Sequence, residues 1–182
     1  MPFNSDDDDK NIPPDEGMPE QQPDGEGTRT CEVKVMGVFE DVPENEQEPP
    51  NYFVLLRDNR DRRLPVLIGP FEAQAIAWAV RGERLTPRPM THDLLKNIIE
   101  RLGAKVERLT IDDLWQETYY AKVSLTVGDK IIDVDTRPSD GIALAMRADA
   151  PIYVSEAVLE EANRPQESGG SMEEPFNPPD EE

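Results

Sequence analysis

One stretch, ETYYAKVSLTVGDKIIDVD at residues 117–135, constrains the fold more than any other part of this chain. Up to Val127 its apolar residues alternate with polar ones, which is the period of a half-buried strand. Gly128 and Asp129 then suit a two-residue turn with glycine first. The register set by this turn pairs Val127 with Lys130, Leu125 with Ile132, Val123 with Val134, Ser124 with Asp133, and Lys122 with Asp135. We therefore predict an antiparallel hairpin that carries two carboxylates on one polar face.

Shorter apolar runs on both sides of this hairpin predict further strands and helices. Strands are expected at residues 31–40, 52–58, 64–69, 105–111 and 150–154. Helices are expected at residues 71–81, from an N-cap at Thr91 to Gly103, from about Ser139, and over SEAVLEEA with Ser155 as its cap. Because strands and helices mix without strict alternation, we predict an α+β fold with a mixed, mostly antiparallel sheet and about four helices.

The helix predicted after Thr91 carries a continuous apolar stripe. The stripe consists of Leu94, Leu95, Ile98, Ile99 and Leu102. We expect it to pack into the core, and a surface between identical chains is the alternative use. We also expect the protein to form a homo-oligomer.

Both ends of the chain differ in composition from its middle. The chain has 182 residues, 18 prolines and a formal net charge of -20. Runs such as SDDDDK near the start and EEPFNPPDEE near the end cannot bury enough apolar surface to offset chain entropy. We therefore predict disordered acidic tails at residues 1–30 and 164–182, around a single domain at residues 31–163.

The sequence shows no signal of a membrane or secreted protein. It has no run of about 18 apolar residues, and its first residues form no apolar signal-peptide core. We therefore expect a cytoplasmic protein that does not cross a membrane. Cys31 is the only cysteine, which excludes an intrachain disulfide and a thiolate metal cluster.

Carboxylates are the candidate metal ligands. Asp133, Asp135 and Asp140 lie close together in the sequence, and Asp93 opens a predicted helix. Such oxygen ligands suit Mg²⁺ or Mn²⁺, and a bound ion inverts the local charge so that a phosphate can approach an acidic protein. We predict that Asp135, Asp140 and Asp93 converge on a divalent metal, with Asp133 or Glu72 as a further ligand.

The same carboxylates also have structural interpretations. Asp135 lies opposite Lys122 in the predicted hairpin, where the two can form an ion pair. Asp140 and Asp93 each stand in the first turn of a predicted helix, where a negative charge favours the helix dipole. The sequence leaves the metal and the structural interpretations open.

His92 and Arg137 are the candidates for acid–base and phosphate chemistry. His92 is the only histidine, and an imidazole is the side chain best suited to exchange protons near neutral pH. Arg137 has the planar fork that suits a phosphate. The alternatives are a histidine bonded to a carboxylate and an arginine in a salt bridge with an aspartate. Tyr119 is expected in the core, and Tyr120 could stack on a base.

Two basic islands interrupt the acidic sequence. They are RDNRDRR at residues 57–63 and RGERLTPR at residues 81–88. Arg63 and Arg88 from these islands, together with Lys122, are the candidates for binding a nucleic-acid backbone. Solvated charge in turns is the alternative interpretation of the islands.

Five motifs in a fixed order resemble one known family. They are LPVLIGPFEAQAI (64–76), RPMTHDLL (88–95), TYYAKVSL (118–125), VDTRPSDGIALAMR (134–147) and APIYVSEAVL (150–159). Over about Cys31 to Ala162 the chain resembles the bifunctional nuclease (BFN) domain family. This resemblance implies nuclease action on RNA and DNA, which we expect to be metal-assisted and of low sequence preference. A non-catalytic module of the same fold, binding a small ligand or a protein, is the competing hypothesis. The family usually has alanine in place of Gly141, and we expect the glycine to loosen that helix.

Overall fold

The computed structural model describes residues 29–43, 45, 49–82 and 87–164. Seven strands form one sheet in the order β3-β2-β1-β7-β4-β5-β6. The strands are β1 (Thr30–Asp41), β2 (Asn51–Asp58), β3 (Arg63–Ile68), β4 (Ala104–Trp115), β5 (Thr118–Val127), β6 (Lys130–Thr136) and β7 (Ile152–Ser155). The helices are α1 (Pro70–Arg81), α2 (Thr91–Arg101), α3 (Pro138–Ala148) and α4 (Glu156–Ala162). All neighbouring strands are antiparallel except β4 and β7, which confirms the predicted α+β class.

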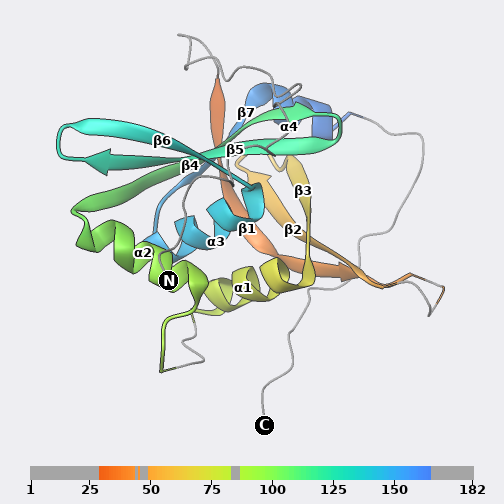
Figure 1. The fold of residues 1–182 in the computed structure, drawn as a ribbon. Helices are drawn as coiled ribbons and strands as arrows, with labels where there is room; N and C mark the ends of the chain where they lie inside the picture. The colour runs from red at the N-terminus through yellow and green to blue at the C-terminus, as the bar shows by residue number, and fades with distance from the viewer. Residues whose placement is uncertain (1–28, 44, 46–48, 83–86, 165–182) are drawn as a thin grey trace, which may run out of the picture.

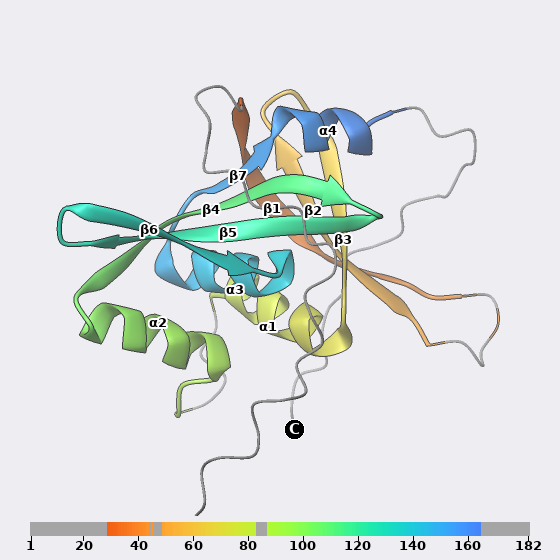
Figure 2. The same cartoon turned by 45° about the horizontal axis from the view of Figure 1, so that its top comes forward.

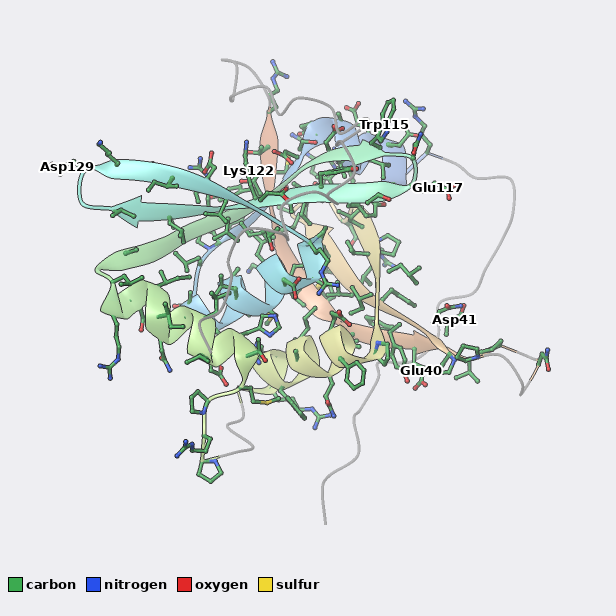
Figure 3. The ribbon with its side chains drawn as sticks, in the orientation of Figure 1. Glu40, Asp41, Trp115, Glu117, Lys122 and Asp129 are labelled. Carbon is green, nitrogen blue, oxygen red and sulfur yellow. The ribbon has the colours of Figure 1, made fainter. Side chains whose placement is uncertain are left out.

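The hairpin of β5 and β6 has the predicted register along its whole length. Val127 is the partner of Lys130, and Lys122 is the partner of Asp135. Asp129 lies in the turn at the far tip of the hairpin (Figure 3). The carboxylates of Asp133 and Asp135 therefore lie on one face of an edge strand, as expected.

Three of the helices lie together on one side of the sheet. Figures 1 and 2 show α1, α2 and α3 below β4 and β5, with α4 on the opposite side. α3 packs against α1, α2, β4 and β5, so it stands at the centre of the helical layer. The core between the layers contains the fully buried side chains of Leu56, Leu64, Ile76, Leu109 and Ile142. No helix in the described ranges is both long and apolar enough to span a membrane.

The apolar stripe of α2 does not pack into the core as predicted. Only Ile99 is buried. The exposed fractions of the other members are 50% for Leu94, 42% for Leu95, 46% for Ile98 and 77% for Leu102. The physical reason is position, because α2 packs mainly against α3 and β4, at one side of the helical layer. The N-cap of α2 is also Met90 and not Thr91.

Gly141 lies where α3 approaches the sheet most closely. A Cβ atom at this position would collide with Cδ1 of Leu109 and lie 3.1 Å from Cγ2 of Thr136. Leu109 is fully buried, so its side chain has little room to move. Close packing between α3 and the sheet therefore accounts for a glycine at this position, and alanine would disturb that packing.

We expect Gly141→Ala to lower the free energy of unfolding by about 1 kcal/mol. Overpacking a core costs about 1–3 kcal/mol, and replacing glycine in a helix returns about 1 kcal/mol. Urea denaturation of both proteins measures the difference. A more stable variant would show that Leu109 yields without strain and that helix propensity dominates.

A cluster of ionic side chains joins the turn between β2 and β3 to β1 and α4. The carboxylate of Asp58 is completely buried, and it accepts hydrogen bonds from the backbone N–H groups of Arg60 and Arg62, both at 2.9 Å. The guanidinium of Arg62 binds Asp58 and Glu156, and Glu156 also accepts a hydrogen bond from the thiol of Cys31 at 2.9 Å. That hydrogen bond, with burial, raises the pKa of the Cys31 thiol, which disfavours its reactive thiolate.

We expect acid to destabilise the protein through this cluster. Hydrogen bonds from Arg62 and Cys31 hold the pKa of Glu156 at about 2, below its ordinary value of 4.5. Burial raises the pKa of Asp58, but hydrogen bonds from Arg62 and Arg60 outweigh it and hold that pKa below its ordinary value. Since both carboxyl groups have lower pKa values in the folded state, their stabilisation is complete above about pH 4.5 and is lost as the pH falls toward about 2.

Thermal unfolding followed by circular dichroism between about pH 6 and pH 2 measures this effect. The Glu156→Gln variant is the matched control, because it lacks one titrating group and should show a shallower decline. Parallel declines in the two proteins would contradict the assignment.

Candidate functional site

A cavity of about 420 Å³ opens where the end of β3, the start of α1, the turn between β4 and β5, and the junction of β6 with α3 meet. Its charged lining residues are Glu72, Glu117, Asp135 and Arg137, and its aromatic ones are Tyr119 and Tyr120. Figure 3 shows Glu117 at the turn between β4 and β5. Apolar side chains of β3 complete the wall. The fold thus gathers at one cavity three segments that are far apart in the sequence.

Arg137 links α1 to α3 at the edge of this cavity. It is the N-cap residue of α3, and its Nε donates a hydrogen bond to Oδ2 of Asp140 at 2.7 Å. Its Nη2 lies 3.2 Å from Oε1 of Glu72, in the first turn of α1. The sequence alternative of a salt bridge with an aspartate is therefore present. Because 67% of the side chain is exposed, the guanidinium is also accessible to an anion.

His92 joins this group from α2. Its Nε2 lies 3.3 Å from Oδ1 of Asp140, and its side chain is 14% exposed. Burial raises the pKa of Asp140, but hydrogen bonds from Arg137 and His92 and their charges outweigh it and lower that pKa on balance. The carboxylate is therefore ionised at neutral pH and can orient the imidazole. If Nε2 carries the hydrogen, Nδ1 of a neutral His92 ring is the atom that accepts a proton.

Asp93 does not belong to the cavity group. Its Oδ1 accepts a hydrogen bond from Nε of Arg147 at 2.7 Å, and its Oδ2 accepts one from the backbone N–H of Met90 at 3.1 Å. The carboxylate thus holds the first turn of α2, which agrees with the structural interpretation made from the sequence. Arg147 was missed at that stage, because its partner lies 54 positions away and no local pattern marks it.

The carboxylates predicted to bind a metal do not converge as one set: Asp140 and Glu72 both contact Arg137, and Asp135 lines the cavity with Glu72, but Asp93 is held by Arg147. The predicted set was Asp135, Asp140 and Asp93, with Asp133 or Glu72. Asp133 accepts a hydrogen bond from Ser124 at 2.6 Å, and both oxygens of Asp140 are used by His92 and Arg137. Over the ranges that the structure describes, no three His, Cys, Asp or Glu side chains are placed to hold a metal ion. The guanidinium of Arg137 already takes Asp140 and Glu72 as its partners, so these side chains as arranged do not fit Mg²⁺ or Mn²⁺.

The basic residues predicted to bind a nucleic-acid backbone lie in three different settings. Lys122 of β5 is only 14% exposed and lies 3.2 Å from Asp112 of the neighbouring strand β4 (Figure 3). Arg63 begins β3, and the first residue of that strand to line the cavity is Val66, about 10 Å further along at the rise of a strand. Arg88 is exposed in the segment before α2. The structure therefore does not gather these three side chains at the cavity.

Two tyrosines and a serine add to the cavity wall. Tyr119 packs against the core as expected but also lines the cavity, and burial raises its pKa. Tyr120 lines the same cavity. Ser139, next to the start of α3, is buried in the wall and was not singled out as a site residue from the sequence. The cavity therefore offers aromatic surface beside a guanidinium.

Comparisons with known proteins show the family to which this chain belongs. The family model described as "Bifunctional nuclease domain" matches residues 54–167. "Uncharacterized protein MT1877" of Mycobacterium tuberculosis is 43% identical over 132 residues, which are 72% of this chain and 75% of that protein. "Bifunctional nuclease 2" of Oryza sativa subsp. japonica is 30% identical over 142 residues, 76% of this chain and 42% of that protein. "Bifunctional nuclease 2" of Arabidopsis thaliana is 27% identical, over 55% of this chain and 31% of that protein.

Proposed function

Since this chain belongs to the bifunctional nuclease domain family, we propose that it hydrolyses the phosphodiester bonds of RNA and DNA with low sequence preference. The observation that carries the proposal is the series of contacts from His92 through Asp140 and Arg137 to Glu72, of which Arg137 and Glu72 line the cavity. It places a group that can move protons beside a cation that can bind a phosphate. The plant relatives named as bifunctional nucleases support the same class of reaction.

In this proposal Arg137 binds the scissile phosphate. Cleavage builds up negative charge on the phosphoryl oxygens, and a guanidinium neutralises it through two parallel hydrogen bonds. The phosphate competes with Glu72 and Asp140 for these hydrogen bonds, and the high exposure of Arg137 permits that exchange. Arg137 therefore changes partner when substrate binds.

His92 is proposed as the general base. With one ring nitrogen held by Asp140, the other accepts the proton of the attacking water, and the carboxylate stabilises the imidazolium that forms. As the water oxygen bonds to phosphorus, the P–O bond to the leaving sugar oxygen breaks, and that oxygen takes a proton from solvent water. Tyr119 and Tyr120 offer faces on which a base stacks, which suits substrates of any sequence. Glu72 positions Arg137 before the substrate arrives.

A cleavage assay with the purified full chain tests the proposal. Single- and double-stranded RNA and DNA, labelled at one end, should all be shortened by the wild type. Addition of EDTA, followed by Mg²⁺ or Mn²⁺, tests the predicted metal requirement in the same tubes. Nucleic acid that is bound but never cut would favour the non-catalytic module. A separate experiment, fractionation of cells, tests the predicted cytoplasmic location.

We further propose that copies of the chain associate through the exposed face of α2. Four large apolar side chains of this helix, Leu94, Leu95, Ile98 and Leu102, are exposed, and such a patch favours contact with another protein surface. Light scattering after size exclusion should give a multiple of the monomer mass for the wild type. Ile98→Glu should shift it toward the monomer, whereas Lys105→Glu, in the neighbouring strand β4, should not. A monomeric wild type would contradict the proposal.

A further inference from the structure

One partly buried arginine outside the cavity binds all three helices of the helical layer. Arg147 lies in the last turn of α3, and its side chain is 10% exposed. Its Nη1 donates to the carbonyl oxygen of Ala143 in α3 at 2.9 Å, and its Nη2 donates to that of Ala75 in α1 at 3.1 Å. Its Nε binds Asp93 in α2 at 2.7 Å. A single rigid fork thus sets α2 against the other two helices.

This fork acts on the residue next to His92. Asp93 follows His92 in the first turn of α2, where consecutive side chains point about 100° apart around the helix axis. The N–H of Met90 fixes the Asp93 carboxylate within the first turn of α2, and the bond from Arg147 then ties that turn to α3, so α2 cannot rotate about its axis without breaking the Arg147–Asp93 bond. The direction of the His92 side chain toward Asp140 is set at the same time.

Apolar packing alone holds α2 weakly. Ile99 is its one buried residue, and the rest of its apolar stripe is exposed. Two polar contacts tie the first turn of α2 to α3. His92 contacts Asp140 in the first turn of α3, and Asp93 contacts Arg147, two turns further along α3. Loss of the second contact removes a restraint on the residue next to His92, and with it part of what fixes the direction of the His92 side chain.

We propose that Arg147 is a positioning residue for the hydrolysis proposed above, acting through Asp93 to hold His92 against Asp140. The kinetic consequence rests on the proposed function. The geometric consequence does not, because it can be measured without any cleavage. Arg147 is part of neither the cavity lining nor the series of contacts from His92 to Glu72.

Kinetics of Arg147→Lys test the proposal first. Lysine keeps the charge but cannot bind three partners in fixed directions. We expect kcat to fall by about 10-fold to 100-fold, as for a small displacement of a catalytic group, while KM changes by less than about 2-fold. Asp93→Asn should cause a similar loss, and the double variant should lose no more than either single one.

The matched control is Arg62→Lys. Arg62 is also partly buried, at 19% exposed, and binds two carboxylates, but it belongs to the cluster with Asp58 and Glu156. Its variant should lose stability and keep the wild-type kcat. Equal losses of kcat in the Arg147 and Arg62 variants would mean that destabilisation explains both, and would overturn the proposal.

Nuclear magnetic resonance tests the geometry independently. His92 is the only histidine, so its ring protons give a single set of signals. A nuclear Overhauser effect between this ring and the β protons of Asp140 should be present in the wild type and in Arg62→Lys, and lost in Arg147→Lys. If that variant does not fold, Asp93→Asn removes the same ion pair and supplies the measurement.

The kinetic and the nuclear magnetic resonance experiments distinguish a failure of the proposed function from a failure of the positioning role. A wild type that cuts no nucleic acid would refute the proposed function, and the Overhauser effect would still decide the positioning role. An Arg147→Lys protein that keeps the effect would overturn the positioning role, whether or not kcat falls.

Discussion

Replacing His92 by alanine should lower the cleavage rate by about 100-fold or more and leave the protein folded. In the proposed reaction this imidazole takes the proton of the attacking water, and no second histidine can replace it. Its side chain is 14% exposed and makes one polar contact with Asp140, so its removal affects the chemistry more than the core. Initial rates on labelled RNA and single-stranded DNA, with circular dichroism of each protein, measure both effects.

Asp140→Asn sharpens the same prediction. The amide keeps the shape of the side chain but removes the charge that stabilises an imidazolium, so a loss of similar size is expected. Arg101→Ala is the matched control, because Arg101 lies in the exposed last turn of the same helix and should leave the rate unchanged. If the His92 and Asp140 variants cleave like the wild type, the activity belongs to a contaminant and the binding-module hypothesis gains support.

Replacing Arg62 by alanine should lower the free energy of unfolding by about 3–5 kcal/mol, the typical effect of removing one partner of a buried ion pair. The carboxylate of Asp58 is completely buried, and Arg62 is its charged partner within the cluster. Without Arg62 the negative charge stays in the protein interior with only backbone N–H groups to solvate it. Urea denaturation measures the loss.

A control variant and a double variant test whether the loss of stability comes from the buried charge. Arg57→Ala removes an exposed ion pair with Asp61, which should change stability by less than about 1 kcal/mol. Asp58→Asn combined with Arg62→Ala should recover part of the loss, because no uncompensated charge remains in the interior. An Arg62→Ala protein as stable as Arg57→Ala would show that Asp58 is hydrated in solution.

Most of the secondary structure could be predicted because its signals are local. The hairpin register follows from a two-residue turn and an alternating pattern, both contained within residues 118–136. The cap of α4 at Ser155 was also predicted, and its hydroxyl accepts the N–H of Val158 three positions on. The wrong expectation depends on tertiary packing. The stripe of α2 is apolar enough to be buried in a core, but the fold places this helix at the side of the helical layer, where most of the stripe stays exposed.

The sequence supplied the candidate residues and two kinds of contact, a histidine bonded to a carboxylate and an arginine paired with an aspartate, but not the way these contacts join into one series. His92, Arg137, Asp140 and Glu72 were all candidates from the sequence, and the structure joins them in one series of contacts. The sequence suggested carboxylates around a metal ion. In the structure the guanidinium of Arg137 contacts the carboxylates of Asp140 and Glu72. Asp93 instead binds Arg147, a residue that no local sequence pattern indicates.

The sequence by itself determined the strands, the helices, their main turns and the family, because backbone hydrogen bonds and side-chain periodicity act between near neighbours. Only the tertiary structure decided which charged side chains from distant parts of the sequence form ion pairs with each other. The strength of an ion pair depends on the distance between two charges and on their burial, and partners such as His92 and Asp140, 48 positions apart, acquire both only when the helices pack.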